Sequence, residues 1–259
     1  MAKGLHYRIF GAGYTTVYLH GFLESSTMWE PLDLVNQPGQ HLLIDLPGHG
    51  KSPLIDDSDS PSIRFMAEEV VRVLKEQNIK EYRVIGHSMG GYVALELFNL
   101  RLETTSLLQH VTLMNSNCWE DNEIKKEERL KIVRIAYKAK DLFINEVVPN
   151  LFARAHDFYP QIEALKKEAK EISSDSIAYA TLAIRNRNDY TALVLSNPEC
   201  FTFIHGALDR LVSMDDIQLR LILPKGPSPK IIILPSAGHM AHWESKKELI
   251  DILYPDPEL

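Results

Sequence analysis

Ser88 lies in a sequence pattern that can turn a serine hydroxyl into a nucleophile. The pentapeptide GHSMG occupies residues 86–90, directly after the apolar run YRVI and directly before an amphipathic stretch that ends at Leu102. A strand, a sharp turn and a helix in this order make a G-x-S-x-G nucleophile elbow, which exposes the serine hydroxyl. Cβ atoms at Gly86 and Gly90 would crowd the strand against the helix, so glycine suits both positions.

A serine hydroxyl becomes a strong nucleophile when a base accepts its proton and a third group orients that base. Two later residues each follow an apolar, strand-like run and have the required side chains. Asp209 comes after FTFIHGAL, and His239 comes after IIILPSAG. The sequence therefore predicts that Ser88, His239 and Asp209 form a catalytic triad.

Other residues compete for the roles of acid and base. Asp215 and Asp216 fall where a helix should begin, which favours a role at the helix N-terminus. His205 belongs to its strand, and His242 belongs to the helix that follows His239. Asp209 and His239 remain the best candidates.

Backbone N–H groups must stabilise the negative charge that develops on the attacked carbonyl oxygen. Met89 follows the nucleophile at a helix start, and Phe22 lies in the HGF sequence after a strand, so these two are the expected donors. The neighbouring His20, Gly21 and His87 are expected to contact substrate.

The elements that must position these residues follow an alternating pattern. Short apolar runs alternate with helical patterns, which predicts an α/β fold with a mostly parallel central sheet and helices on both faces. Strands are expected at residues 5–10, 15–19, 41–45, 82–85, 110–114, 201–205 and 230–234. A helix is expected to run to about Gln77, with Ser60 as its N-cap and Pro61 as its first residue.

The alternation stops between the fifth and sixth of these strands. Residues 117–197 contain helical patterns and no convincing strand. Because ligands bind at the carboxyl edge of open α/β sheets, we interpret this segment as an all-helical cap over that edge. The core domain is then made of residues 1–116 and 198–259.

Five short motifs along the chain resemble those of the α/β-hydrolase fold superfamily. They are HGF at 20–22, DLPGHGKS at 45–52, GHSMGG at 86–91, GALD at 206–209 and GH at 238–239. The resemblance covers essentially the whole chain and implies an α/β-hydrolase fold with a Ser-His-Asp site. A serine at position 88 argues against the relatives that use an aspartate there, the haloalkane dehalogenases and epoxide hydrolases. Asp45 is expected to bond locally within its loop.

The predicted function is hydrolysis of a carboxylic ester or thioester of a small acyl substrate through an acyl-enzyme on Ser88, with no cofactor and no metal. One alternative is a lyase or a C–C bond hydrolase of the same fold, similar to the menaquinone-pathway lyase. Another is a non-catalytic ligand receptor on a hydrolase scaffold. A panel of simple aryl esters separates an esterase from a dedicated lyase.

Basic residues in the predicted cap are candidates for substrate recognition. Arg185 and Arg187 could reach the mouth of the pocket, or they could pair with carboxylates of the cap. The segment 123–140 carries seven basic residues, which either form a solvated helix face or attract an acidic carrier.

Composition limits the partners of this chain of 259 residues. Its 28 basic and 35 acidic residues give a net charge of −7, which argues against a nucleic-acid surface. No segment has the length of a signal peptide core or of a membrane span. Two distant cysteines, Cys118 and Cys200, make no metal-binding pattern, which is typical of a reducing, cytoplasmic location. The expected partner is a small molecule, and the oligomeric state stays open.

Overall fold

A computed structural model describes residues 4–55, 61–101, 107–224 and 226–255 of the chain. Its core is a 7-stranded sheet with the order β1-β3-β2-β4-β5-β6-β7. The strands are β1 (Tyr7–Ala12), β2 (Thr15–Leu19), β3 (Gly39–Ile44), β4 (Glu81–His87), β5 (Leu107–Met114), β6 (Phe201–Gly206) and β7 (Lys230–Leu234). Strand β1 runs antiparallel to β3, and all other neighbours are parallel. The prediction of a mostly parallel sheet is confirmed.

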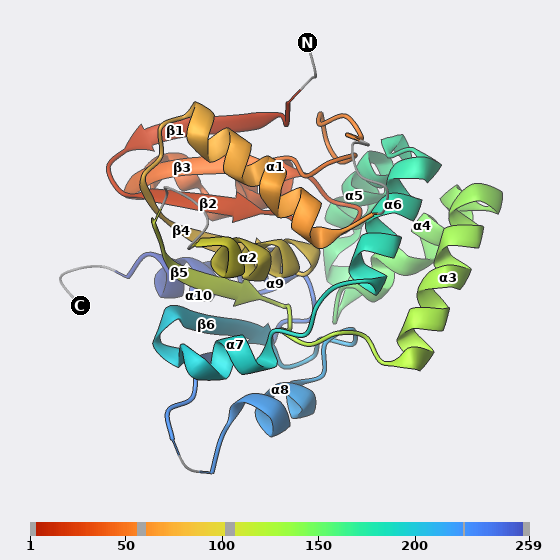
Figure 1. Cartoon of the computed structure of the whole chain (residues 1–259). Coiled ribbons are helices and arrows are strands. Elements are labelled where there is room, and N and C mark those ends of the chain that lie inside the picture. Colours follow the sequence, from red (N-terminus) through yellow and green to blue (C-terminus); the bar gives the residue numbers. More distant parts are fainter. Residues whose placement is uncertain (1–3, 56–60, 102–106, 225, 256–259) are drawn as a thin grey trace.

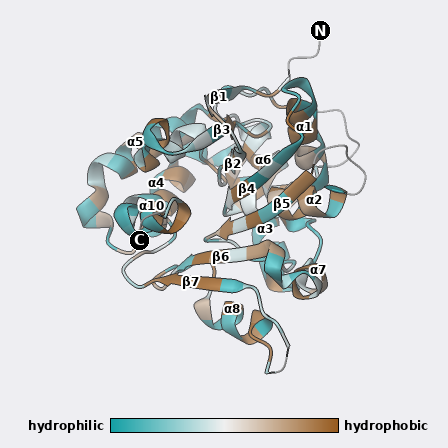
Figure 2. Cartoon of the chain, turned by 90° about the vertical axis from the view of Figure 1, so that its left-hand side faces the viewer, coloured by the Kyte–Doolittle hydropathy of each residue, from teal (hydrophilic) through white to brown (hydrophobic). Residues whose placement is uncertain are grey.

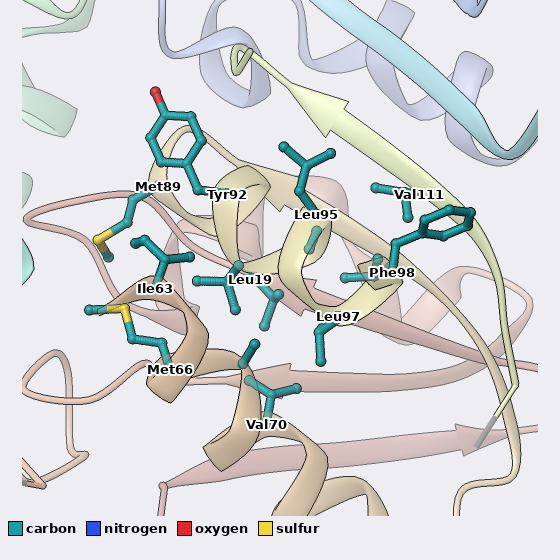
Figure 3. Close-up of a cluster of buried hydrophobic side chains, with 14 of the residues drawn as sticks. Leu19, Ile63, Met66, Val70, Met89, Tyr92, Leu95, Leu97, Phe98 and Val111 are labelled. Atoms are coloured by element: carbon teal, nitrogen blue, oxygen red, sulfur yellow. The ribbon is translucent and has the colours of Figure 1, made fainter. Parts of the chain in front are cut away.

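Helices cover both faces of this sheet (Figure 1). One face packs against α1 (Ile63–Glu76), α2 (Met89–Leu100) and α8 (Met214–Leu221). Figure 3 shows side chains of α1 and α2 meeting those of the sheet in this cluster. The other face packs against the 3₁₀ segment η1 (Ser26–Leu32) and the short helices α9 (Ala241–Glu244) and α10 (Lys246–Leu253). Most residues of β2, β4 and β6 are buried, as coverage on both faces requires. Figure 2 shows hydrophobic stretches in β5 and β7.

Between β5 and β6, the described chain consists of helices and loops. The helices are α3 (Glu123–Lys138), α4 (Lys140–Asn150), η4 (Ala155–Phe158), α5 (Tyr159–Glu171), α6 (Ser174–Arg185), α7 (Thr191–Ser196) and η5 (Pro198–Cys200). Helices α3 to α6 group beyond the ends toward which the parallel strands point (Figure 1). No helix in the described ranges is long and apolar enough to cross a membrane.

The helical insertion is packed in two different ways. Helices α4 and α5 pack in a hydrophobic cluster around Phe152 and Ile162, which Ile177 of α6 joins. Helix α6 also places Tyr179, Ala180 and Ala183 in the cluster that α1 and α2 share with the sheet. Part of the insertion is therefore continuous with the core, and its division into a separate cap remains a prediction.

The first long helix begins later than the sequence suggested. Its N-cap is Ser62, whose hydroxyl accepts a hydrogen bond from the Phe65 N–H at 3.0 Å. The expected cap, Ser60, lies outside the described residues, and Pro61 precedes the helix. Two serines flank this proline, and the hydrophobic periodicity that begins at Ile63 agrees with the second one.

Replacement of Ser62 by alanine is expected to lower the free energy of unfolding by about 1 kcal/mol, because the Phe65 N–H loses its acceptor. Urea denaturation measures the loss. Ser62→Asp is the matched control, since it keeps a capping oxygen and should retain most of the stability. Equal losses in both variants would contradict this assignment of the cap.

Candidate active site

Ser88 occupies a strained turn between strand β4 and helix α2. Its backbone has φ 50° and ψ −114°, a left-handed region that side-chain-bearing residues rarely adopt. A Cβ at Gly86 would lie 2.3 Å from the carbonyl oxygen of Gly90, and a Cβ at Gly90 would lie 2.2 Å from that of Leu19. The expected need for glycine on both sides of the serine is confirmed.

The three residues predicted to form the triad lie in one hydrogen-bonded chain. Ser88 Oγ is 3.0 Å from His239 Nε2, and His239 Nδ1 is 2.8 Å from Asp209 Oδ2. Because a carboxylate only accepts, Nδ1 donates to Asp209, which leaves Nε2 to accept the Ser88 hydroxyl proton. Burial alone would raise the pKa of Asp209, but His239 stabilises the carboxylate and holds this pKa far below its usual range.

Asn115 secures both the acid and the loop that carries the base. Its side-chain amide donates to Asp209 Oδ2 at 3.0 Å and to the Gly238 carbonyl at 2.9 Å. It adopts φ 48° directly after strand β5. Asn115 was assigned no role in the sequence analysis. Its position at the strand end was the signal that a polar residue there could reach the acid.

The competing candidates lie elsewhere or have other partners. Asp215 and Asp216 are in the first turn of α8, as predicted. His205 is in β6 and its Nε2 donates to the Val212 carbonyl at 2.8 Å. Buried His242 packs against the ring of His87. Burial, together with the positive charge of His87, lowers the pKa of His242 to about 3.

His87 forms a buried ion pair with Glu24, a residue that sequence reasoning missed. His87 Nδ1 is 2.9 Å from Glu24 Oε2, and its Nε2 is 2.9 Å from the His239 carbonyl oxygen. Both partners are acceptors, so both ring nitrogens must carry protons and the ring is an imidazolium. Burial alone would lower the pKa of His87, but Glu24 raises it above its usual value. Burial alone would raise the pKa of Glu24, but His87 lowers it to about 2.

These hydrogen bonds bear on the expectation that His20, Gly21 and His87 contact substrate. His87 borders the pocket, but both of its nitrogens bind protein groups, so it orients the His239 loop. His20 lies outside the pocket lining: its Nδ1 donates to the Gly21 carbonyl, and its Nε2 accepts from the Leu46 N–H. Gly21 borders the pocket, and its N–H donates to Glu24 at 2.6 Å. Because these polar groups already bind protein atoms, we do not include them among the proposed substrate contacts.

Of the two expected oxyanion donors, Met89 directly follows Ser88 in the chain and Phe22 shares its pocket. Met89 is the first residue of α2, where helix N–H groups have no partner within the helix. Phe22 lines the same pocket as Ser88 and follows the end of β2.

A pocket of about 260 Å³ opens on Ser88 and His239. Its walls come from the loop after β2, from α3 and α4, and from the loop before α8. Most of its surface is apolar, and nine of its twenty lining residues have purely hydrocarbon side chains: Phe22, Leu23, Ile132, Phe143, Val147, Leu151, Ile184, Leu211 and Val212. Within the described ranges, no group of His, Cys, Asp or Glu side chains could hold a metal ion.

Arg185 and Arg187, the two expected substrate contacts in the insertion, do not line this pocket. Arg187 is buried, and its guanidinium donates to Asp121 Oδ1 and to two backbone carbonyls. Arg185 donates to the Lys126 carbonyl and to the Asn186 side chain. Both arginines hold the insertion together, and neither remains in our proposal for substrate contact.

Comparison with known proteins places this geometry in a family. A model described as the alpha/beta hydrolase family matches residues 16–252. The chain belongs to that family. The pimeloyl-[acyl-carrier protein] methyl ester esterase of Aeromonas hydrophila is 26% identical to it, over 94% of this chain and 95% of the esterase. A solved esterase from Thermogutta terrifontis shares the fold with a TM-score of 0.84 at 21% identity, covering 96% of this chain and 91% of that one.

A second kind of relative matches only locally. The 2-succinyl-6-hydroxy-2,4-cyclohexadiene-1-carboxylate synthase of Photorhabdus laumondii is 42% identical over 81 residues. This match spans 30% of the present chain and 27% of the synthase.

The Glu24–His87 pair predicts a pH-dependent contribution to stability. Glu24→Gln removes a buried charge partner and is expected to cost about 3–5 kcal/mol of unfolding free energy near neutral pH. Because the pKa of Glu24 is lowered from 4.5 to about 2, this contribution is lost as the pH falls through that interval. Because the pKa of His87 is raised, the contribution is also lost as the pH rises through the folded value.

Denaturant unfolding of both proteins across the pH range measures this difference. The exposed Glu163→Gln, which breaks a surface pair with Lys166, is the control and should change stability by less than about 1 kcal/mol. A difference between wild type and Glu24→Gln that is constant with pH would contradict the ion pair.

Proposed function

We propose that this protein is a serine hydrolase that cleaves carboxylic esters or thioesters of small acyl substrates through an acyl-enzyme on Ser88. One observation carries the proposal: Ser88, His239 and Asp209 form a continuous hydrogen-bonded chain whose serine faces a mostly apolar pocket. The full-length similarity to an esterase supports the same class of reaction.

In the proposed acylation, His239 Nε2 accepts the Ser88 proton while Oγ forms a bond to the substrate carbonyl carbon. The carbonyl π electrons move to its oxygen, which the N–H groups of Phe22 and Met89 stabilise. The tetrahedral carbon then expels the alcohol or thiol, which takes the proton from His239. Asp209 stays ionised and stabilises the transient imidazolium.

Deacylation repeats these steps with water as the nucleophile. His239 removes a proton from the water as its oxygen attacks the acyl carbon, and the same proton returns to Ser88 Oγ as that bond breaks. The products are a carboxylic acid and the free serine.

Ser88→Ala is expected to reduce the hydrolysis of short acyl p-nitrophenyl esters by a factor on the order of 10⁴ or more, because the attacking oxygen is absent. A fluorophosphonate probe should label the wild type at Ser88 and leave the variant unlabelled. Peptide mapping by mass spectrometry identifies the labelled residue.

Two controls accompany that experiment. Ser62→Ala changes a serine that does not line the pocket and should keep both labelling and activity. Circular dichroism confirms that Ser88→Ala is folded. Absence of fluorophosphonate labelling in folded wild-type protein would contradict the proposed mechanism.

The second candidate is a lyase or C–C bond hydrolase that uses the same three residues. The local 42% identity to a synthase favours it, because that enzyme belongs to a different reaction class. Simple aryl esters separate the two: rapid turnover of several acyl chains supports the esterase. Labelling of Ser88 together with negligible ester turnover supports the second candidate.

A further inference from the structure

Helix α3 presents charged side chains to a pocket whose surface is mostly apolar. Lys125, Glu128, Arg129 and Ile132 all line it. Their spacing of three, four and seven residues places them on one face of the helix. A helix face that only closed an apolar cavity would itself be apolar. The charged face therefore indicates that this end of the pocket receives a polar group.

One of these side chains is held in a fixed orientation. Arg129 Nε donates to Asp121 Oδ2 at 3.0 Å, and the other oxygen of Asp121 accepts from Arg187 Nη2 at 2.9 Å. The Asp121 side chain is 2% exposed, so this carboxylate is a rigid anchor. Burial alone would raise its pKa, but the two arginines lower it and keep the group ionised.

The local charges do not balance. The single carboxylate of Asp121 pairs with two guanidiniums, those of Arg129 and Arg187. These three side chains carry one net positive charge, and the Arg129 side chain is only 25% exposed. Within the described chain its Nε is bonded and its two Nη groups have no hydrogen-bond partner. A partly buried guanidinium that shares its carboxylate with a second arginine is stabilised further when another anion pairs with it.

We propose that Arg129 forms a carboxylate-binding subsite, so that the preferred substrates are esters that carry a carboxylate at the end remote from the reacting carbonyl. This inference rests on the proposed hydrolase function. The planar guanidinium matches a carboxylate in shape and charge, and its free Nη groups can donate to both carboxylate oxygens. Apolar side chains of the same pocket, such as Val147 and Ile184, would contact the connecting chain.

Paired esters test this subsite. One set contains p-nitrophenyl half-esters of linear dicarboxylic acids, and its neutral partners are p-nitrophenyl alkanoates of the same length. A second pair places the carboxylate on the alcohol side, as in acetylated hydroxy acids and their methyl esters. In the wild type, kcat/KM for the best anionic ester should exceed that of its neutral partner by about tenfold or more.

Arg129→Gln should remove this preference by lowering kcat/KM for the anionic ester about tenfold while the neutral ester changes little. Arg129→Lys keeps the charge and should retain part of the preference. Lys131→Gln removes one positive charge from the same helix outside the pocket lining, and it should leave the preference intact. Equal selectivity in wild type and Arg129→Gln would overturn the subsite, even if both enzymes hydrolyse esters well.

A binding measurement keeps the subsite separate from the chemistry. A monomethyl ester of a dicarboxylic acid should raise the thermal unfolding midpoint of Ser88→Ala, and the added Arg129→Gln change should abolish the shift. No shift in either protein would also overturn the subsite. A shift that depends on Arg129 in a chain without ester turnover would retain the subsite and reject the proposed function.

Discussion

The close approach of strand β4, helix α2 and strand β2 around Ser88 is the constraint on which the site depends. The backbone of the serine is left-handed, and the two flanking glycines leave no room for a Cβ against the Gly90 and Leu19 carbonyls. Such strain costs about 1–3 kcal/mol and persists only where the surroundings enforce it. Helix α2 supplies that enforcement, because nearly every residue along it is buried between the sheet and its neighbours.

The base is held mainly through its backbone. The His239 N–H donates to the Leu151 carbonyl, and the His239 carbonyl accepts from His87. The carbonyl of the preceding Gly238 accepts from Asn115, and the Gly238 N–H donates to Glu244. Leu151 follows α4 in the helical insertion, so the geometry of the base is tied directly to the helices that line the pocket.

Much of the fold was predictable because its signals are local. Strand β2 and strand β7 agree with the predicted ranges, and residues 117–197 contain helices and no strand, as predicted. The three residues of the proposed triad were also predictable, because each follows its own strand at the same sheet edge. The prediction of Ser60 as the helix N-cap was wrong, because serines flank Pro61 on both sides and the second one, Ser62, is the cap.

Other parts of the site depend on contacts across long stretches of chain. Glu24 meets His87 across 63 residues, and Asp121 meets Arg187 across 66 residues. Neither pair has a sequence spacing that marks it, so the roles expected of His87 and Arg187 changed once the partners were visible. Arg129 appeared as one of seven basic residues. Only the orientation of α3 shows that Arg129 and Lys125 line the pocket, and only the fold brings Arg129 to Asp121.

Strands β5 and β6 are adjacent and parallel, so the whole helical insertion is a single crossover between neighbours in the sheet. Its two ends are fixed by the sheet, whereas its length is not. Grafting a different helical segment between these strands would leave the strand register unchanged and alter the pocket walls. Any such chimera must still place a backbone carbonyl oxygen where that of Leu151 lies, because this oxygen accepts the hydrogen bond from the His239 N–H.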